Sequence, residues 1–261
     1  MRDAIREFLR RLLPAKLRSR LKFFGFRYRC PFCQSYLRSF LPYGLRIPVL
    51  QHYQVIGGGY RHNALCPVCG SLDRERLLYL FLRSNTDVFD TPRKRLLHIA
   101  PEARVADILR AHSKVDYLTA DLNSREVMLR MDIVDICFRA NSFDAIICNH
   151  VLEHVIDDRK GMSELFRTLK PGGWAILQVP LSLALNHTCE DHSKTTPRAR
   201  AEAFGQSDHV RIYARDDYEH RLAQAGFKVD SFNWIAAPDN FGGRKNVFGL
   251  NEQECVYFLR K

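Results

Sequence analysis

A regular alternation of apolar runs with amphipathic runs begins at Arg95, and it constrains the fold more than any other feature of the sequence. The spacing of apolar residues predicts helices over 101–112, 151–169 and 216–225. Short apolar runs predict strands over 95–100, 117–120, 133–136, 143–148, 174–179, 227–232 and 255–259. Repeated strand–helix units build a mostly parallel sheet with helices on both faces, so we expect an α/β protein.

The N-terminal third carries different patterns. Residues 1–13 place apolar side chains at helical spacing and arginines on the other face, which predicts an amphipathic helix that ends at Pro14. Residues 49–56 are predicted to form a strand that leads into Gly57-Gly58-Gly59, and residues 72–84 a helix. These segments do not follow the strand–helix alternation and therefore indicate a separate N-terminal part.

Positive charge is concentrated at the N-terminus. The 261 residues carry a net charge of +11, of which residues 1–29 contribute +8 and residues 30–261 only +3. So weak a charge on the body argues against a nucleic-acid-binding fold. No apolar run reaches the roughly 18 residues of a membrane span, and arginines interrupt the position of a secretory signal. We expect a cytoplasmic protein, with a peripheral membrane contact through residues 1–24 left open.

Four cysteines form two matching pairs, Cys30-Pro-Phe-Cys33 and Cys66-Pro-Val-Cys69. Two residues between cysteines let a tight turn bring both thiolates to one ion, and two such turns supply the four sulfurs that tetrahedral zinc prefers. Gly70 follows the second pair where the turn needs a positive φ, and Gln34 holds the equivalent place in the first pair. Because four cysteines leave no open position, this zinc is expected to stabilise a zinc-ribbon module rather than to catalyse.

These cysteines have two alternative roles. Four buried free thiols would need no metal. A thioredoxin-like redox pair would need a strand-to-helix context that neither pair has.

The chain resembles a class I S-adenosylmethionine (SAM)-dependent methyltransferase of the type-11 group in two stretches, Asn141-Ser-Phe-Asp-Ala-Ile-Ile-Cys-Asn-His150-Val-Leu-Glu153-His154-Val and Glu164-Leu-Phe-Arg-Thr-Leu-Lys-Pro-Gly-Gly173. The resemblance covers roughly residues 94–235. The cysteine pairs make the chain similar to members of that group that carry a zinc ribbon. The resemblance implies a Rossmann-like sheet of seven strands, mostly parallel with one antiparallel strand, and it implies methyl transfer from SAM.

The resemblance also implies where SAM lies. In an open α/β sheet the ligand sits beyond the carboxyl ends of the strands, where the strand order reverses. Asp121 ends a strand where the family uses an acid for the ribose hydroxyls, and Asp132 matches the acid near the adenine amine. Asn149 and His150 fall at the mouth beside the sulfonium. A solvated loop carboxylate or a helix cap is the alternative role of both acids.

The first motif of the family is altered in this chain. The family has acid-x-Gly-x-Gly-x-Gly, whereas this chain has His98-Ile-Ala100-Pro-Glu102-Ala-Arg104. Glycine lets the backbone approach the cofactor closely, and Ala100 is the smallest substitute. Glu102 could accept a hydrogen bond from the amino group of SAM or only complement the helix dipole. We expect SAM to be held in a variant way by His98, Ala100 and Glu102, with a relative that has lost binding as the alternative.

Three histidines are candidate bases. An acceptor hydroxyl or amine must be oriented and must lose a proton. His150 is the first candidate by position, and His209 is the second because the polar stretch 180–215 falls where this fold builds its acceptor pocket. His154 lies four residues after His150, one turn further along the predicted helix. Capping a helix or bonding to the backbone is the alternative role of each.

Four functions follow from these features. The first choice is methyl transfer from SAM to an unidentified acceptor, a glycan or other small molecule near a membrane. An RNA methyltransferase that uses the zinc ribbon for recognition and a non-catalytic binding module are the alternatives, with nucleic acid the less favoured partner. Residues 150–154 also contain H-x-x-E-H, the pattern of a zinc hydrolase with two histidine ligands, and this is a remote alternative.

The expected organisation has four segments. They are a basic amphipathic helical arm at 1–29, a zinc-ribbon module at 30–72, a linking helix at 73–93, and a SAM-dependent methyltransferase domain at 94–261 with a substrate-side insertion at 180–215.

Overall fold

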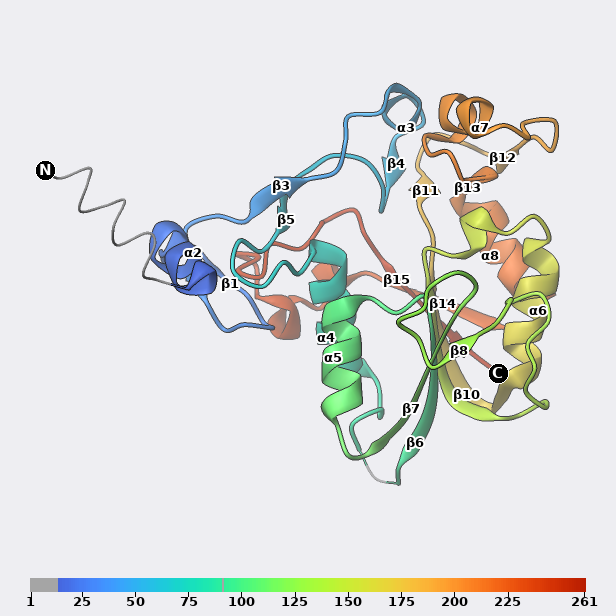
Figure 1. The fold of residues 1–261 in the computed structure, drawn as a ribbon, viewed down its shortest axis with the longest axis horizontal. Coiled ribbons are helices and arrows are strands. Elements are labelled where there is room, and N and C mark those ends of the chain that lie inside the picture. The colour runs from blue at the N-terminus through green and yellow to red at the C-terminus, as the bar shows by residue number, and fades with distance from the viewer. Residues whose placement is uncertain (1–13, 91) are drawn as a thin grey trace, which may run out of the picture. The chain divides into compact units, whose positions relative to one another are not determined.

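The main sheet of the computed structural model, which describes residues 14–90 and 92–261, has seven strands (Figure 1). They are β6 (Lys94–Ile99), β7 (Val115–Asp121), β8 (Leu129–Arg130), β9 (Phe143–Asn149), β10 (Leu169–Gln178), β14 (Lys228–Phe232) and β15 (Val256–Arg260). Their order is β14-β15-β10-β9-β6-β7-β8, with β15 antiparallel to both neighbours and the other strands parallel to one another. This confirms the Rossmann-like sheet expected from the sequence.

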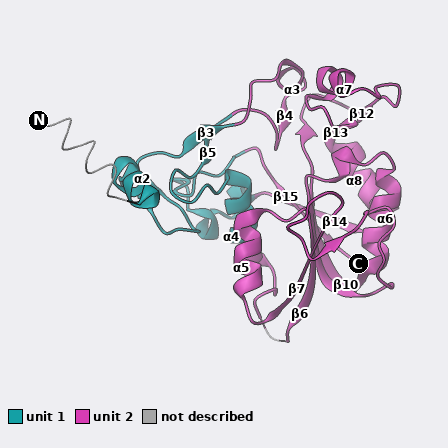
Figure 2. Cartoon of the chain, in the orientation of Figure 1, with its two compact units in different colours: residues 1–43, 61–80, 234–252 teal, residues 44–60, 81–233, 253–261 magenta. Residues whose placement is uncertain are grey.

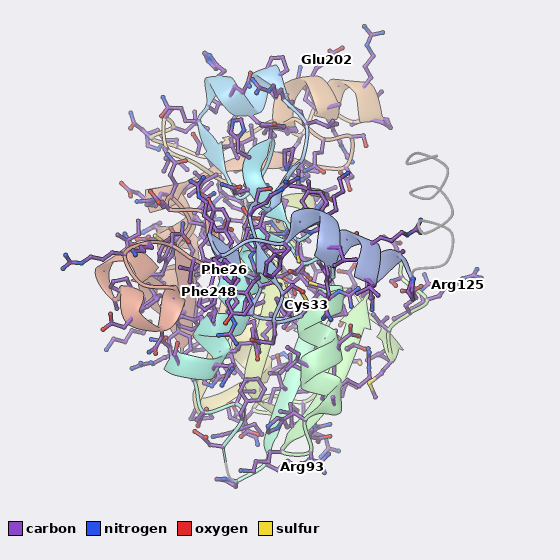
Figure 3. The ribbon with its side chains drawn as sticks, turned by 90° about the vertical axis from the view of Figure 1, so that its left-hand side faces the viewer. Phe26, Cys33, Arg93, Arg125, Glu202 and Phe248 are labelled. Atoms are coloured by element: carbon purple, nitrogen blue, oxygen red, sulfur yellow. The ribbon has the colours of Figure 1, made fainter. Side chains whose placement is uncertain are left out.

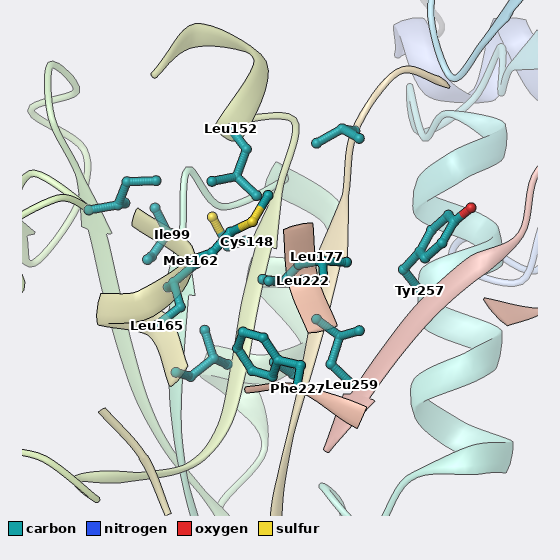
Figure 4. Packing of buried hydrophobic residues seen from close by; sticks show 14 of the residues in the cluster. Ile99, Cys148, Leu152, Met162, Leu165, Leu177, Leu222, Phe227, Tyr257 and Leu259 are labelled. Carbon is teal, nitrogen blue, oxygen red and sulfur yellow. The ribbon is translucent and has the colours of Figure 1, made fainter. Parts of the chain in front are cut away.

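Helices cover both faces of this sheet, which explains why its central strands are almost entirely apolar. Helix α5 (Ala103–Ala111) lies on one face, and α6 (Asp158–Thr168) and α8 (Arg215–Gln224) lie on the other (Figure 1). Figure 4 shows the core on the side of α6 and α8, where Met162 and Leu165 pack with Leu222. The sheet is thereby held as a rigid platform whose strand ends carry polar residues.

The strand order reverses between β6 and β9. The chain runs from β6 outward to β7 and β8, and then returns to place β9 on the opposite side of β6. β6 pairs in parallel with both β7 and β9. The carboxyl ends of β6 and β9 therefore lie side by side, and the loops that follow them diverge in opposite directions, which leaves a crevice for a ligand.

The chain divides into two units, described separately below (Figure 2). Unit 2 comprises residues 44–60, 81–233 and 253–261 and contains the seven-stranded sheet, whereas unit 1 comprises residues 1–43, 61–80 and 234–252.

Unit 2 also holds a small sheet with the order β12-β13-β11-β4. Its strands and neighbouring helices are α3 (Pro48–His52), β4 (Val55–Ile56), β11 (Leu181–Ser182), β12 (Cys189–Glu190), α7 (Pro197–Phe204) and β13 (Arg211–Ala214). Buried charges attach this sheet to the helices. Arg221 of α8 contacts Asp158 of α6 and Glu190 of β12 at 2.9 Å each.

Unit 1 is built from short elements. They are α2 (Ala15–Phe23), the β1 (Tyr28–Arg29) and β2 (Tyr36–Leu37) hairpin, β3 (Leu41–Tyr43) paired with β5 (Arg61–Leu65), the first part of α4 (Asp73–Asn85), and the 3-10 turns η2 (Trp234–Ala236) and η3 (Pro238–Phe241). So small a unit buries little apolar surface and therefore depends on other interactions for stability.

The fully buried guanidinium of Arg76 is one such interaction. It donates to five backbone carbonyls, those of Asn63, Ala64, Ser71, Phe248 and Gly249, at 2.8–3.2 Å. Its Cζ also lies 3.8 Å from the centroid of the Phe40 ring. One side chain thus joins three stretches of unit 1 that are far apart in the sequence.

Three of the predicted elements are wrong in detail. Residues 49–56 form α3 and β4 instead of one strand, because Pro48 occupies the first turn of a helix. The third strand is β8, whereas residues 133–136 lie in a turn that the Asp132 carboxylate stabilises by accepting from the N–H of Val134. The helix predicted over 151–169 begins only at α6. The helix predicted over 1–13 lies outside the described residues.

The helix after β9 starts late for a local reason. The Asp157 side chain accepts a hydrogen bond from the N–H of Lys160 at 3.0 Å and so caps α6. Residues Leu152–His154 form only a short 3-10 turn, η1.

Among residues 14–90 and 92–261, no helix is long and apolar enough to cross a membrane.

We expect Arg76→Met to lower the free energy of unfolding by about 3 kcal/mol or more, because five buried carbonyls lose their donor. Denaturant unfolding of the zinc-loaded protein, followed by the fluorescence of the buried Trp234 of unit 1, measures this change. Arg18→Met is the matched control, since Arg18 is exposed on α2 and its loss should cost less than about 0.5 kcal/mol. Equal losses in the two variants would contradict the role of Arg76.

Candidate functional site

Two residues with strained backbones lie at the switch point. Ala100 follows β6 with a φ of 48°, and His150 follows β9 with a φ of 55°. Side chains other than glycine pay about 1–2 kcal/mol for this left-handed conformation, and such strain collects at functional sites. Ala100 thus adopts the backbone conformation that favours glycine at the place where the methyltransferase motif was found altered.

A hydrogen-bonded chain crosses the same edge of the sheet. The Tyr117 hydroxyl lies 2.9 Å from Nδ1 of His98, and Nε2 of His98 lies 2.7 Å from Oε2 of Glu102. The side-chain amide of Asn149 donates to Oε1 of Glu102 at 3.0 Å, and its Oδ1 accepts from the N–H of Gln178 at 3.1 Å. His98, Glu102 and Asn149 are therefore brought together as predicted for neighbours of one site.

Glu102 stabilises the loop after β6 through its charge. Burial raises the pKa of this carboxyl, but the hydrogen bond and charge of His98 and the bond from Asn149 outweigh burial and lower the pKa to about 2. The carboxylate is therefore ionised at neutral pH. Both of its oxygens accept from side chains of unit 2, so its structural contacts exist without a ligand.

The two acids that follow β7 and β8 both close turns. Oδ1 of Asp121 accepts from the N–H groups of Asn123 and Ser124 at 2.7 Å each. This fixes the carboxylate at the end of β7 and leaves Oδ2 available to a ligand hydroxyl. Asp132 is exposed and accepts only from the N–H of Val134 within the described chain.

The catalytic candidates surround one buried carboxylate. Oε1 of Glu153 lies 3.5 Å from Nδ1 of His150 and 4.0 Å from Nε2 of His154. The rings of His154 and His209 meet edge to face with centroids 4.6 Å apart. All three candidate bases are therefore neighbours. The sequence predicted His154 one turn further along an α-helix, but it lies on the 3-10 turn η1.

The surroundings shift the pKa values of Glu153 and His209 for different reasons. Burial raises the pKa of Glu153, but the hydrogen bond from His150 and the charges of the nearby histidines lower it more, so the net pKa is below the ordinary value. Burial lowers the pKa of His209 to about 4. His209 is therefore a neutral imidazole at pH 7, whereas His150, whose side chain is 14% exposed, lies directly after β9.

A glycine loop approaches His150. A Cβ atom built on Gly57, which has a φ of 74°, would lie 3.5 Å from Cε1 of His150 and 3.7 Å from Oε1 of Glu254. A small hollow beside this glycine is lined by Gln178, Arg215, Glu254 and Tyr257 among others. The sequence showed the glycine triplet but gave no sign that it lies next to the carboxyl end of β9.

The four paired cysteines meet in unit 1, as the sequence predicted. Figure 3 labels one of them, Cys33. Each pair forms the same turn: the N–H of Cys30 donates to Ser35 and that of Gln34 to Cys30, and the N–H of Cys66 donates to Ser71 and that of Gly70 to Cys66. Gln34 has a φ of 57° and Gly70 a φ of 78°, so both pairs use the positive φ expected after the second cysteine.

The sulfur positions suit zinc. Sγ of Cys30 lies 3.6 Å from Sγ of Cys69, and Sγ of Cys33 lies 3.8 Å from Sγ of Cys66. Four thiolates at about 2.3 Å from one zinc ion would be about 3.8 Å apart, whereas a disulfide needs about 2.05 Å. All four cysteines are free. The donor set and spacing thus fit a tetrahedral ion.

Three further residues of these sites, Ser35, Ser71 and Tyr117, were not predicted from the sequence. Ser35 and Ser71 stand two positions after Cys33 and Cys69, and each hydroxyl lies 3.3 Å from that sulfur. Their equal offset in the two pairs was the available signal. Tyr117 gave none, because its contact with His98 depends on the parallel register of β6 with β7.

Comparisons with known proteins agree with this fold. Residues 73–231 match a family described as methyltransferase domain. A demethylmenaquinone methyltransferase of Clavibacter sepedonicus is 38% identical over 55 residues, which are 21% of this chain and 22% of that protein. The O-methyltransferase cnsE of Penicillium expansum is 32% identical over 98 residues, 38% of this chain and 32% of that protein. The matched residues thus make up less than a third of the length of either curated relative.

A solved SAM-dependent methyltransferase from Mesorhizobium loti aligns with a TM-score of 0.40 at 13% identity, over 65% of this chain and 93% of that one. The family match covers more than half of the chain and includes β6, β7 and β9 with the loops that follow them. The chain therefore belongs to the methyltransferase domain family, and its seven-stranded sheet has the Rossmann-like fold of the class I SAM-dependent members.

Proposed function

We propose that this protein transfers a methyl group from SAM to a hydroxyl or amine of a small molecule. The observation that carries the proposal is the edge of the sheet where the strand order reverses. There the strained Ala100 and His150, the His98–Glu102–Asn149 hydrogen bonds and the Asp121 carboxylate all lie at the carboxyl ends of neighbouring strands. This is where an open α/β sheet binds its ligand.

In this proposal Asp121 holds the ribose hydroxyls of SAM through the carboxylate oxygen that its own turn does not use. The Ala100 backbone comes close to the methionine part, and His98 and Glu102 keep the loop in place for it. Asp132, exposed and next in the chain order, contacts the adenine side. SAM supplies an electrophilic methyl carbon when it is bound.

His150 is the proposed base. Its ring lies beside Gly57, one of the residues that line the small hollow that we assign to the acceptor, and its Nδ1 faces the Glu153 carboxylate. A carboxylate behind an imidazole orients the ring and stabilises the cation that forms when the ring takes a proton. The buried His209 and the partly exposed His154 lie beside the same carboxylate, and we assign both to positioning rather than to direct contact with the acceptor.

We further propose that the cysteine module binds one structural zinc and directs the protein to an anionic membrane surface, where a glycan or other small molecule would be the acceptor. Residues 14–43 contain seven Lys or Arg and no acid. Phe26 is 81% exposed and packs with Phe24, 57% exposed, at a ring distance of 5.2 Å. Exposed aromatic rings among cations suit the interface of an anionic bilayer. RNA is the alternative partner of this basic surface.

Calorimetric titration of SAM into the zinc-loaded protein tests the cofactor. We expect binding in the micromolar range for the wild type and at least about tenfold weaker binding for Asp121→Ala, which removes the bonds to the ribose. Asp116→Ala is the matched control, because Asp116 is an exposed acid near the other end of β7. A wild type that binds no SAM would overturn the proposed function.

The pH dependence of stability tests the loop after β6. The pKa of Glu102 is depressed to about 2, so its stabilisation is complete above the unfolded-state value and is lost as the pH falls. Glu102→Gln should therefore cost about 3 kcal/mol at neutral pH, and the difference from wild type should shrink from about pH 5 downward.

Denaturant unfolding at several values between about pH 7 and pH 3 measures this difference. Glu126→Gln, a change at an exposed acid, is the control and should match the wild type throughout. A Glu102→Gln difference that stays constant with pH would show that its ionised carboxylate is not the source of stability.

Sedimentation with vesicles of phosphatidylcholine and phosphatidylserine tests the membrane contact. Phe26→Ala should weaken binding by about tenfold, because it removes one large apolar side chain from the contact. Leu122→Ala is the control, since Leu122 is 51% exposed in the other unit. Binding to an RNA oligonucleotide but not to vesicles would replace the membrane with RNA in this proposal.

A further inference from the structure

A buried carboxylate oxygen without a partner lies next to the proposed acceptor site. Glu153 is 2% exposed, and among the described residues its Oε2 has no hydrogen-bond partner. A buried carboxylate oxygen that no donor reaches is costly unless a cation compensates it.

Two histidines present nitrogen atoms to this carboxylate. The potential ligand atoms of Glu153, His154 and His209 all lie within 4.8 Å of one another. His209 is 3% exposed, whereas the side chain of His154 is 32% exposed and gives the cluster access to solvent. Ligand atoms about 2.1 Å from one cation would lie about 3–4 Å apart, so a small adjustment would close the site.

The contacts of His154 orient its ring for a ligand. Its Nδ1 lies 3.2 Å from Oδ2 of Asp208, and its Nε2 is the nitrogen that faces Glu153 at 4.0 Å. Histidines that bind metals usually donate their other ring N–H to a carboxylate, which fixes the ring and raises the basicity of the ligand nitrogen. Asp208 stands in that position.

The backbone holds the two ligand segments together. The N–H of Val210 donates to the carbonyl of Glu153 at 2.9 Å. The Arg211 guanidinium, 1% exposed, donates to the carbonyls of Leu152 and Ile156 at 2.9 Å each. The segment with His209 is therefore fixed against the 3-10 turn that carries Glu153 and His154, and the cluster is preorganised before any ion arrives.

We propose that Glu153, His154 and His209 bind one divalent transition-metal cation, separate from the ion of the cysteine module. Two imidazoles and one carboxylate suit Mn²⁺, Fe²⁺, Co²⁺ or Zn²⁺ and leave coordination positions open. The ligand set differs from that of the H-x-x-E-H hydrolases, because the second histidine comes from the 180–215 stretch and not from position 150.

The role of this cation toward the acceptor rests on the proposed function. A cation bound beside His150 lowers the pKa of an acceptor hydroxyl that it coordinates. The hydroxyl proton then passes to the His150 imidazole, an oxygen lone pair forms the bond to the methyl carbon, and the electrons of the broken carbon–sulfur bond stay on sulfur. The products are the methylated oxygen, S-adenosylhomocysteine and a protonated His150.

Titration with Mn²⁺, followed by the loss of the free-ion EPR signal, tests the cation site, because Mn²⁺ prefers nitrogen and oxygen to thiolate ligands. The wild type loaded with a single zinc per chain, in the cysteine module, should bind one Mn²⁺ per chain. Glu153→Gln and His209→Asn should weaken that binding at least tenfold, and Asp208→Asn by about tenfold. Asp208 is 66% exposed, so this last variant does not disturb the core if the others fail to fold.

Controls separate the two ions and the two proposals. His192→Asn, a change at an exposed histidine, should bind Mn²⁺ like the wild type, and Cys33→Ser should lose zinc but keep Mn²⁺. Absence of Mn²⁺ binding in the wild type, or unchanged binding in both Glu153→Gln and Asp208→Asn, overturns the cation site. SAM titration of the same samples is independent: loss of Mn²⁺ binding with SAM binding intact rejects only the cation, and the reverse rejects only the proposed function.

Discussion

The parallel pairing of β6 with β9 is the constraint on which the rest of the site depends. It joins segments almost fifty residues apart and brings Ile99 level with Cys148, so that Ala100 and His150 leave the sheet side by side. Both then adopt a positive φ that costs energy in every L-residue other than glycine. The cost is carried by strands that are buried on both faces and cannot shift, because a change of register would move apolar side chains throughout the core. A rigid sheet thus supports a strained edge, and the strained edge is where ligand chemistry becomes possible.

The altered first motif shows how this chain manages without its glycines. In the family, glycine allows a tight turn after the first strand. Here the turn keeps the left-handed conformation at Ala100, and hydrogen bonds from His98 and Asn149 hold Glu102 in place. A network of this kind is rigid in the absence of cofactor, since its donors and acceptors belong to the protein. The likeness of fold despite the lost glycines is therefore physically consistent: backbone strain is offset by charge-assisted hydrogen bonds that a glycine-rich loop does not have.

Much of the fold was predictable because it depends on local patterns. The strands β6, β7, β9, β10, β14 and β15 follow from apolar runs, and the four cysteines from their spacing. Strand β8 was misplaced because two residues carry no periodic signal. Helix α3 was predicted as part of a strand because apolar residues follow Pro48, which begins the helix. For the site, Asp121 and Asn149 were placed by strand ends. The contacts of Tyr117 and Gly57 were not predictable, because each depends on a register or a fold that brings distant segments together.

The histidine cluster shows the limit of motif reading most clearly. On a helix, H-x-x-E-H would turn His150 and His154 to one face. Here α6 begins only after its cap at Asp157, which is three residues beyond the end of the motif at His154. The motif therefore runs through the end of a strand and a 3-10 turn, and the two histidines approach Glu153 from different directions. Arg211 then brings His209 to the carboxylate from a segment that the motif does not include. The motif therefore contains both the histidine that we propose for proton transfer, His150, and one that we propose as a cation ligand, His154. A methyltransferase fold and a cation site are compatible because the backbone, and not the spacing, decides which side chains meet.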